Sequence, residues 1–215
     1  MNAESASEAL SRRRTLALTP ERFRVLARLA VGSLIVIVAT GATVRLTGSG
    51  LGCHHWPGCQ PNEFLPARGY HSDIEFSNRV VATLTVLMTL VLAVGSLITR
   101  PLEKNVKVLA CIVFAGTLAQ APLGAITVYY NLNPYLVISH LLLSLLVLAV
   151  GVLVLLEATR TVRGAAPALP AIARLGGAVL LAAVSALVVT GTLATAAGPH
   201  PGSESVRRIG TFQPS

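Results

Sequence analysis

Charged residues are scarce in this 215-residue sequence: Asp, Glu, Lys and Arg together make up 12% of it, against 53% hydrophobic residues. A soluble domain of this composition could not cover its apolar surface. Aromatic residues are scarce too, at 5%, so the net charge of +8 comes without the aromatic platforms of a nucleic-acid-binding surface. These shortages exclude a soluble globular domain and favour an integral membrane protein.

Long uncharged tracts replace the missing charge. A helix needs roughly 20 apolar residues to cross a bilayer, and four tracts approach or exceed that length. They are residues 29–44, 80–99, 108–156 and 171–197, and the last contains one charged residue, Arg174, near its start. The third is long enough for two crossings. Because Asn133 is a good N-cap and Pro134 suits a first helical position, we expect one helix to end near Tyr130 and the next to begin at Pro134. The sequence predicts five transmembrane helices.

The basic residues are distributed unevenly between the two sides of these helices. Of the 17 Lys and Arg residues, six precede the first span, three lie between the second and third, and three, Arg160, Arg163 and Arg174, lie between the fourth span and the first turn of the fifth. Those on the other side are Arg45, Arg68, Arg79, Arg207 and Arg208. The positive-inside rule therefore predicts a multi-pass protein of the cell membrane with residues 1–24 as a cytoplasmic tail. The first apolar run lacks a small-residue cleavage site, so no cleavable signal peptide is expected.

Two cysteines, Cys53 and Cys59, lie in the longest predicted outer connection. Disulfides persist outside the cell, and five intervening residues that include a Pro-Gly turn allow the two sulfurs to meet. A metal site that combines both cysteines with His54 or His55 is the alternative. The C-x-x-C-H motif of covalent haem attachment is absent.

Polar residues open the second span. Asp73 is expected to cap this helix, and Glu75, Asn78 and Arg79 follow at i, i+3 and i+4 spacing, on one face. One interpretation is an interfacial Glu75–Arg79 pair that anchors the helix. The other is a functional site, because ionisable groups within a membrane are costly.

A lone histidine, His140, favours the functional interpretation. It lies in the fourth span, about 9 Å from the outer end at 1.5 Å per residue, in the same layer as Glu75 and Asn78. Histidine is the commonest axial ligand of haem iron, and facing helices of an apolar bundle can hold a porphyrin between them. A hydrogen-bonded core histidine is the plainer alternative.

Together these residues resemble the haem A synthase family over about residues 25–210. The resemblance rests on four blocks: Gly41 to Cys53 with Trp56, Pro57 and Cys59; Ile74-Glu75 with Asn78-Arg79; Leu123 to Val128 with Asn133, Pro134 and His140; and Gly198-Pro199-His200. It implies an all-α fold of eight transmembrane helices in two four-helix bundles. The implied activity is oxidation of the C8 methyl of haem O, the substrate, to a formyl group, with haem b as cofactor.

The resemblance also implies roles for individual residues. Glu75 matches the essential acidic residue near the reacting methyl, His140 matches a haem-iron ligand, and Cys53 and Cys59 match the outer cysteine pair. Asn78 stands where many members carry a second ligating histidine. Asn78 and Arg79 are accordingly expected to line the cofactor site.

The expected organisation is a four-helix bundle over residues 25–157 with an outer loop at 46–73, followed by residues 158–215 with the fifth helix. Against the family pattern this resembles a chain truncated after the first helix of an incomplete second bundle, without the half that binds haem b. A catalytically inactive haem-binding protein is therefore the alternative function, and a small b-type electron carrier or a transporter is a third. Expected partners are haem O, haem O synthase, terminal oxidase assembly factors and a second copy of the chain.

Overall fold

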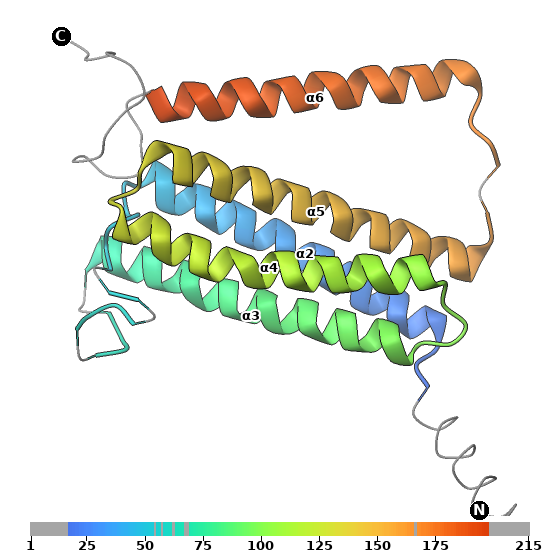
Figure 1. Ribbon diagram of the computed structural model, residues 1–215, viewed down its shortest axis with the longest axis horizontal. Coiled ribbons are helices and arrows are strands. Elements are labelled where there is room, and N and C mark those ends of the chain that lie inside the picture. Colours follow the sequence, from blue (N-terminus) through green and yellow to red (C-terminus); the bar gives the residue numbers. More distant parts are fainter. Residues whose placement is uncertain are drawn as a thin grey trace, which may run out of the picture.

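The computed structural model describes residues 17–53, 55–56, 58–61, 63–66, 69–165 and 167–197. These residues form helices and no named strand (Figure 1). The helices are α2 (Pro20–Leu46), α3 (Tyr70–Ile98), α4 (Lys104–Tyr129), α5 (Pro134–Arg163) and α6 (Ala171–Ala197). All five are long and apolar enough to cross a membrane, which confirms the predicted all-α membrane class.

The break between α4 and α5 lies where the sequence predicts it. The Asn133 side chain accepts a hydrogen bond from the Tyr135 N–H at 3.0 Å, and Pro134 is the first helical residue. In the turn, Asn131 and Leu132 adopt left-handed φ values of 50° and 54°. The Leu132 N–H donates to the Thr127 carbonyl at 2.9 Å, which helps to hold this unusual backbone.

The prediction that Asp73 caps α3 is wrong. The N-cap is Gly69, and the Asp73 N–H donates to the Gly69 carbonyl at 2.9 Å inside the first helical turn. The helix starts earlier because polar Tyr70, His71 and Ser72 extend it beyond the apolar tract, and the Ser72 hydroxyl also bonds to Gly69. Helix α2 also begins before its apolar tract: Thr19 caps it and Pro20 is its first residue.

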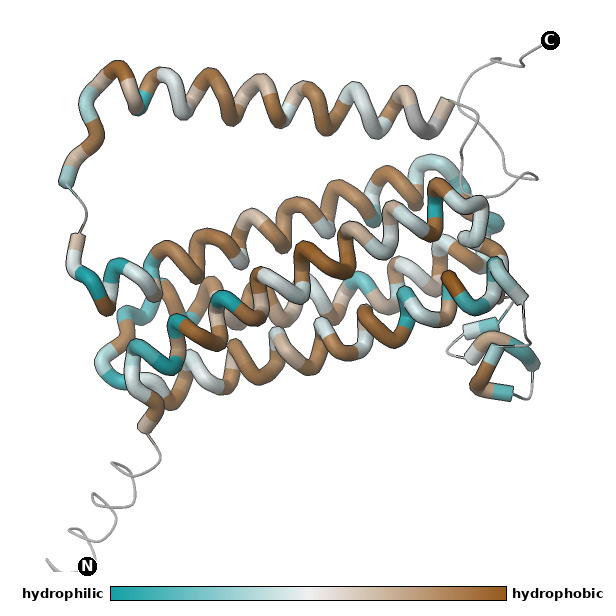
Figure 2. Tube along the Cα trace, turned by 180° about the vertical axis from the view of Figure 1, so that it is seen from behind, coloured by the Kyte–Doolittle hydropathy of each residue, from teal (hydrophilic) through white to brown (hydrophobic). Residues whose placement is uncertain are grey.

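Helices α2 to α5 form a four-helix bundle. Helices α2 and α4 each pack against both α3 and α5, so α3 and α5 lie diagonally across the bundle from each other. Helix α6 contacts α5 alone among the described helices and runs beside the bundle (Figure 1). Hydrophobic residues dominate the middle of every helix, and hydrophilic ones lie mostly toward the two ends (Figure 2).

The apolar core occupies one half of the bundle, which we call the packed half. Its buried residues come from the start of α2, the end of α3, the start of α4 and the end of α5. They are Phe23, Ala27, Ala30, Leu34, Leu92, Val106, Ala110, Val113, Val147, Val154 and Ala158. The 47–69 connection lies at the opposite end, which we call the loop end.

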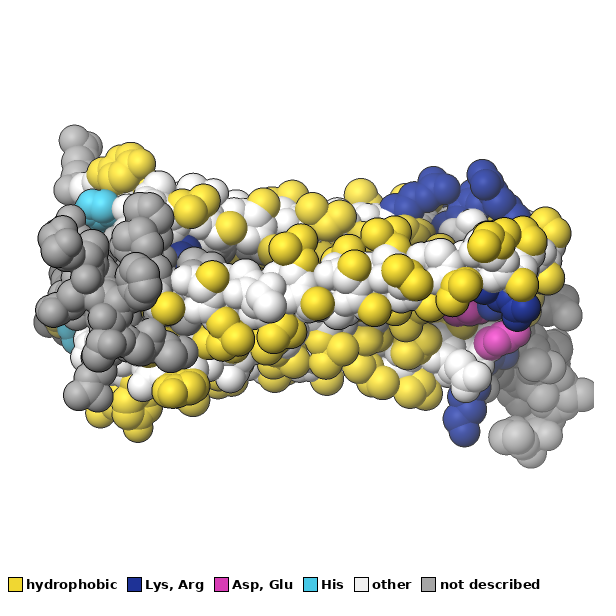
Figure 3. Space-filling view, turned by 90° about the horizontal axis from the view of Figure 1, so that it is seen from above, with side chains coloured by type: hydrophobic (Ala, Val, Ile, Leu, Met, Phe, Trp, Pro, Cys, Tyr) yellow, Lys and Arg dark blue, Asp and Glu magenta, His cyan; other side chains and the backbone are white. Residues whose placement is uncertain are grey.

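Charge also differs between the two ends. In Figure 3, Lys and Arg side chains gather at the end where α2 begins, and few are seen at the loop end. Among those at the crowded end are Arg100, Lys104, Lys107, Arg160 and Arg163, which border or lie within α4 and α5. This arrangement agrees with the side preference that the sequence predicts, and the orientation in a membrane stays a prediction.

Candidate functional site

A disulfide closes the connection at the loop end. Cys53 and Cys59 are joined, with their Cα atoms 4.4 Å apart, and both are fully buried. Of the two interpretations that the sequence left open, the structure has the disulfide, and the described residues contain no cluster of three or more His, Cys, Asp or Glu side chains for a metal ion. Gly52 lies against the backbone of His71 and Ser72, where a Cβ atom would clash. The disulfide loop therefore packs directly on the first turn of α3.

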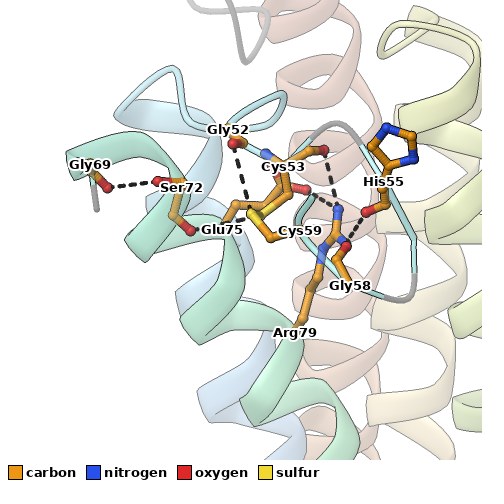
Figure 4. The surroundings of a disulfide bond; sticks show 9 residues. All are labelled: Gly52, Cys53, His55, Gly58, Cys59, Gly69, Ser72, Glu75 and Arg79. Atoms are coloured by element: carbon orange, nitrogen blue, oxygen red, sulfur yellow. Dashed lines mark hydrogen bonds and ion pairs between the residues drawn. A yellow bond between two sulfur atoms is a disulfide. The ribbon is translucent and has the colours of Figure 1, made fainter. Parts of the chain in front are cut away.

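Glu75 lies beneath this loop with only 4% of its surface exposed. One carboxylate oxygen, Oε2, accepts a hydrogen bond from the Cys53 N–H at 2.8 Å (Figure 4). The other, Oε1, forms an ion pair with the guanidinium of Arg79 at 2.6 Å. Both oxygens thus have partners, as a carboxylate removed from water requires.

Arg79 ties the loop to α3. Its Nη1 donates to the carbonyls of His55 at 2.6 Å and Gly58 at 2.7 Å, and its Nη2 reaches the Cys53 carbonyl at 3.4 Å as well as Glu75. Figure 4 shows the guanidinium beneath the loop, with these acceptors around it. The two terminal nitrogens of the guanidinium thus contact the protein itself. The prediction that Arg79 lines a cofactor site stays a prediction.

Asn78 faces α2. Its Oδ1 accepts a hydrogen bond from the Thr40 hydroxyl at 2.7 Å. This bond uses one of the two lone pairs of the amide oxygen. An amide oxygen is in any case a poor ligand for haem iron, because imidazole and thiolate are the usual choices.

His140 projects from α5, six residues after Pro134, and its side chain lies toward α4. A Cβ atom at Gly124 of α4 would lie 3.5 Å from His140 Cε1, which is ordinary contact, so the imidazole lies beside this glycine. The ring nitrogen Nδ1 is buried and has no hydrogen-bond partner. His140 is therefore not the fully hydrogen-bonded core histidine of the plainer interpretation.

The interior around His140 is loosely packed. No residue is buried in 35–46 of α2, 76–84 of α3, 118–126 of α4 or 135–146 of α5, and we call these segments the loose layer. Even the shortest segment covers about 13 Å at 1.5 Å per residue. A bundle helix turns a side chain inward at every turn, so inward side chains here leave their surface partly uncovered.

These features fit a flat, largely apolar group with a metal at its centre. His140 offers an imidazole from one helix of the loose layer, and Glu75 and Asn78 lie at or within the same layer on the diagonal helix. Counted from Tyr70 and Pro134, the Cα atoms of Glu75 and His140 lie about 7.5 Å and 9 Å into their helices. A porphyrin could be held by His140 in this layer, and its iron would supply the redox chemistry.

Sequence patterns found some of these residues and missed others. The structure joins Glu75, Arg79, Cys53 and Cys59 in one cluster, whereas His140 belongs to the α4–α5 side. His71 contacts Ser49, with 3.0 Å between Nδ1 and the hydroxyl oxygen. His54, Arg68, His200, Arg207 and Arg208 lie outside the described residues. Thr40 and Gly124 are among the small and polar residues within spans that signal close helix contacts, but no sequence pattern indicated the contact of Ser144 with Gln120.

Fold and site together define a class: a helical, multi-pass membrane protein with a polar site inside one end of a four-helix bundle. Comparison with known proteins is more specific. The COX15-CtaA family, described as cytochrome oxidase assembly protein, matches residues 24–70 and 70–198. The chain belongs to this family.

Several curated relatives in this comparison are haem A synthases. The chain is 34% identical to that of Bacillus pumilus over 145 residues, 64% of this chain and 46% of the relative. It is 28% identical to that of Geobacillus kaustophilus over 128 residues, 60% and 40% of the two chains. It is 33% identical to that of Lysinibacillus sphaericus over 121 residues, which are 54% of this chain and 38% of the relative. The matches thus span less than half the length of these relatives.

Proposed function

We propose that this chain carries the haem O site of a haem A synthase and takes part in oxidising the C8 methyl of haem O to a formyl group. The observation that carries the proposal is the buried Nδ1 atom of His140, which has no hydrogen-bond partner and lies within the loose layer. The family and the haem A synthase relatives support the reaction class, oxidoreduction on a haem.

His140 is proposed to bind the iron of the substrate haem O. The Asn78 amide oxygen accepts a hydrogen bond from Thr40 and is a poor ligand for haem iron. This bundle would therefore supply one histidine ligand and leave the opposite face of the porphyrin without one. The family resemblance implies that haem b would bind in the second half of the fold, and α6, which would begin that half, contains no histidine.

Glu75 is proposed to act on the methyl group. Conversion of a methyl to a formyl adds one oxygen atom from water and releases four protons and four electrons, and the electrons go to an external acceptor. A carboxylate beside the methyl can accept a proton or stabilise positive charge as the carbon is oxidised. Arg79 and the Cys53 N–H fix both oxygens of this carboxylate, so its direction is set before substrate arrives.

The test is co-expression with a source of haem O, followed by extraction and separation of the haems by chromatography. The expected result is haem A from the wild-type chain and only haem O from Glu75→Gln, which keeps the hydrogen-bonding shape but not the charge. Asp73→Asn, an exposed residue in the same helical turn, is the matched control and should behave as wild type. Full conversion by a folded Glu75→Gln protein would refute the proposed role.

A haem-binding protein without activity of its own is the second candidate, because the chain matches less than half of the length of its relatives. Haem O bound through His140, without conversion to haem A, would favour it. Loss of the Soret absorbance in His140→Ala, with absorbance kept in His71→Ala, would assign the binding in either case. No haem absorbance in the wild type would favour the transporter hypothesis.

The proposed setting is the cell membrane, with the amino terminus in the cytoplasm. The crowding of basic side chains at the end where α2 begins supports that orientation. Haem O synthase, terminal oxidase assembly factors and a second copy of the chain are proposed partners, and no nucleic acid is expected to bind. Mass measurement in mild detergent tests the homo-oligomer.

A further inference from the structure

Gln120 of α4 and His140 of α5 are in contact, and each carries a buried polar atom without a hydrogen-bond partner. Among the described residues, three buried side-chain nitrogen or oxygen atoms have no hydrogen-bond partner: Gln120 Oε1, His140 Nδ1 and Arg24 Nε. Arg24 lies at the far end of the bundle, near the start of α2. The other two belong to side chains within the loose layer.

Hydrogen bonds hold the Gln120 amide against α5, at the turn from His140 to Ser144. Its Nε2 lies 3.3 Å from the His140 carbonyl and 3.0 Å from the Ser144 hydroxyl. The Ser144 hydroxyl itself donates to the His140 carbonyl at 2.8 Å. A carbonyl only accepts hydrogen bonds, so the amide nitrogen must be the atom that faces it. The atom left without a partner is therefore the acceptor, Oε1.

Gln120 Oε1 and His140 Nδ1 can form a hydrogen bond with each other when the imidazole carries its proton on Nδ1. An imidazole that binds a metal through Nε2 carries its proton on Nδ1, and metal-bound histidines almost always donate that proton to an oxygen. Gln120 Oε1 needs a donor, and His140 Nδ1 then is one. Gly124, one turn along α4 from Gln120, places no side chain beside the imidazole.

We infer that Gln120 is a positioning residue, which accepts the Nδ1–H of His140 when Nε2 binds haem iron. The inference rests on the proposed function. Its effect follows from electrostatics: an acceptor on Nδ1–H increases the electron density of the ring and fixes its orientation. Ferric iron is thereby stabilised over ferrous iron, and haem binds more tightly.

The experiment titrates hemin, ferric protoporphyrin IX, into the purified full chain in mild detergent. Affinity is read from the Soret band, and the reduction potential is read by spectroelectrochemical titration. Gln120→Met, which keeps the length but has no strong acceptor, should bind hemin about tenfold more weakly. It should also shift the ferric–ferrous equilibrium about tenfold toward ferrous, an increase of about 59 mV for one electron.

Two further variants separate positioning from packing. Gln120→Glu retains an acceptor oxygen and should keep a potential at or below that of the wild type. Ser144→Ala removes a hydrogen bond of the amide nitrogen but leaves Oε1 in place, so its potential should match the wild type. This pair keeps the inference testable even if Gln120→Met does not fold.

Three results would overturn the inference. The reduction potential of Gln120→Met could equal that of the wild type, Gln120→Met and Ser144→Ala could raise the potential equally, or Gln120→Glu could raise it. His140→Ala distinguishes this failure from that of the proposed function. Hemin that binds His140→Ala with an unchanged Soret band would refute ligation by His140 itself.

Discussion

The two halves of the bundle use the same four helices in different ways. In the packed half, apolar side chains fill the space between the helices, and Phe23, Val113 and Val154 are fully buried. At the loop end the buried groups are mainly polar or belong to the disulfide, and they include Glu75, Ser49, Cys53 and Cys59. One half thus holds the helices together, while the other half is fastened at its end by hydrogen bonds and leaves the loose layer between.

The two ion pairs of the described residues illustrate the same contrast. Glu75–Arg79 at the loop end is largely buried, with side-chain exposures of 6% and 16%. Glu157–Arg160 at the opposite end has exposures of 34% and 58%. Burial makes a charge depend on its partner, whereas water replaces a lost partner at the surface. The predictions below test this contrast, beginning with the largest expected effect.

Arg79→Leu should destabilise the protein by about 3–5 kcal/mol, because it leaves the Glu75 carboxylate buried without its cation. Arg160→Leu, the matched change in the exposed pair, should cost at most about 1 kcal/mol. Reversible unfolding in mixed detergent micelles measures both values. Equal costs for the two variants would contradict the contrast between the two ends.

Two glycines of α4 test the packing of the two halves. A Cβ atom at Gly116 would lie 2.6 Å from Val147 Cγ2, and valine has little rotamer freedom in a helix. Gly116→Ala should therefore cost about 1–3 kcal/mol. At Gly124 the nearest atom is 3.5 Å away, so Gly124→Ala should be neutral or stabilise by up to about 1 kcal/mol. The same unfolding measurement compares the stability of the two variants. A larger loss of stability in Gly124→Ala than in Gly116→Ala would refute the loose layer.

Removal of the disulfide should have a moderate effect. Disulfides stabilise by about 0–5 kcal/mol, with smaller values for shorter closed loops, and the two cysteines here are six residues apart. Because Arg79 also holds this loop through three carbonyls, we expect Cys53→Ser with Cys59→Ser to cost about 1–2 kcal/mol. In an Arg79→Leu background the same change should cost more. Strict additivity of the two changes would show that they act independently.

The smallest effect should come from the contact between α2 and α3. Thr40→Val removes the hydroxyl that donates to Asn78, and such hydrogen bonds within membranes contribute about 0.6 kcal/mol on average. The hydroxyl of Thr43 bonds only to its own helix, at the Ala39 carbonyl, so Thr43→Val is the control. A change at Asn78 in the amide region of an isotope-edited infrared spectrum, present in Thr40→Val and absent in Thr43→Val, would locate the effect.

Much of the fold could be predicted from the sequence. The apolar tracts give the five helices, since a bilayer demands a length and a composition that are visible in one dimension. The α4–α5 turn follows from Asn133 and Pro134, because capping is a local interaction. The start of α3 was misplaced, because the polar residues before Asp73 extend that helix beyond its apolar tract.

The candidate site was predictable in its parts and unpredictable in its contacts. Glu75 and His140 stood out because ionisable groups inside spans are rare and costly. Their surroundings depend on residues far away in the sequence: Glu75 on the Cys53 N–H, 22 residues before it, and the His140 carbonyl on Gln120, 20 residues before it. No local pattern fixes such partners.

The sequence by itself therefore determined the number of helices, their approximate ends and the side chains that a membrane makes expensive, because hydropathy and capping act over a few neighbouring residues. Tertiary structure decided that Cys53 and Cys59 form a disulfide, that Arg79 fastens this loop above Glu75, and that α3 and α5 face each other across a loose layer. These features arise when helices distant in the sequence pack side by side. Only that packing determines which buried polar atoms have partners and which, like His140 Nδ1, do not.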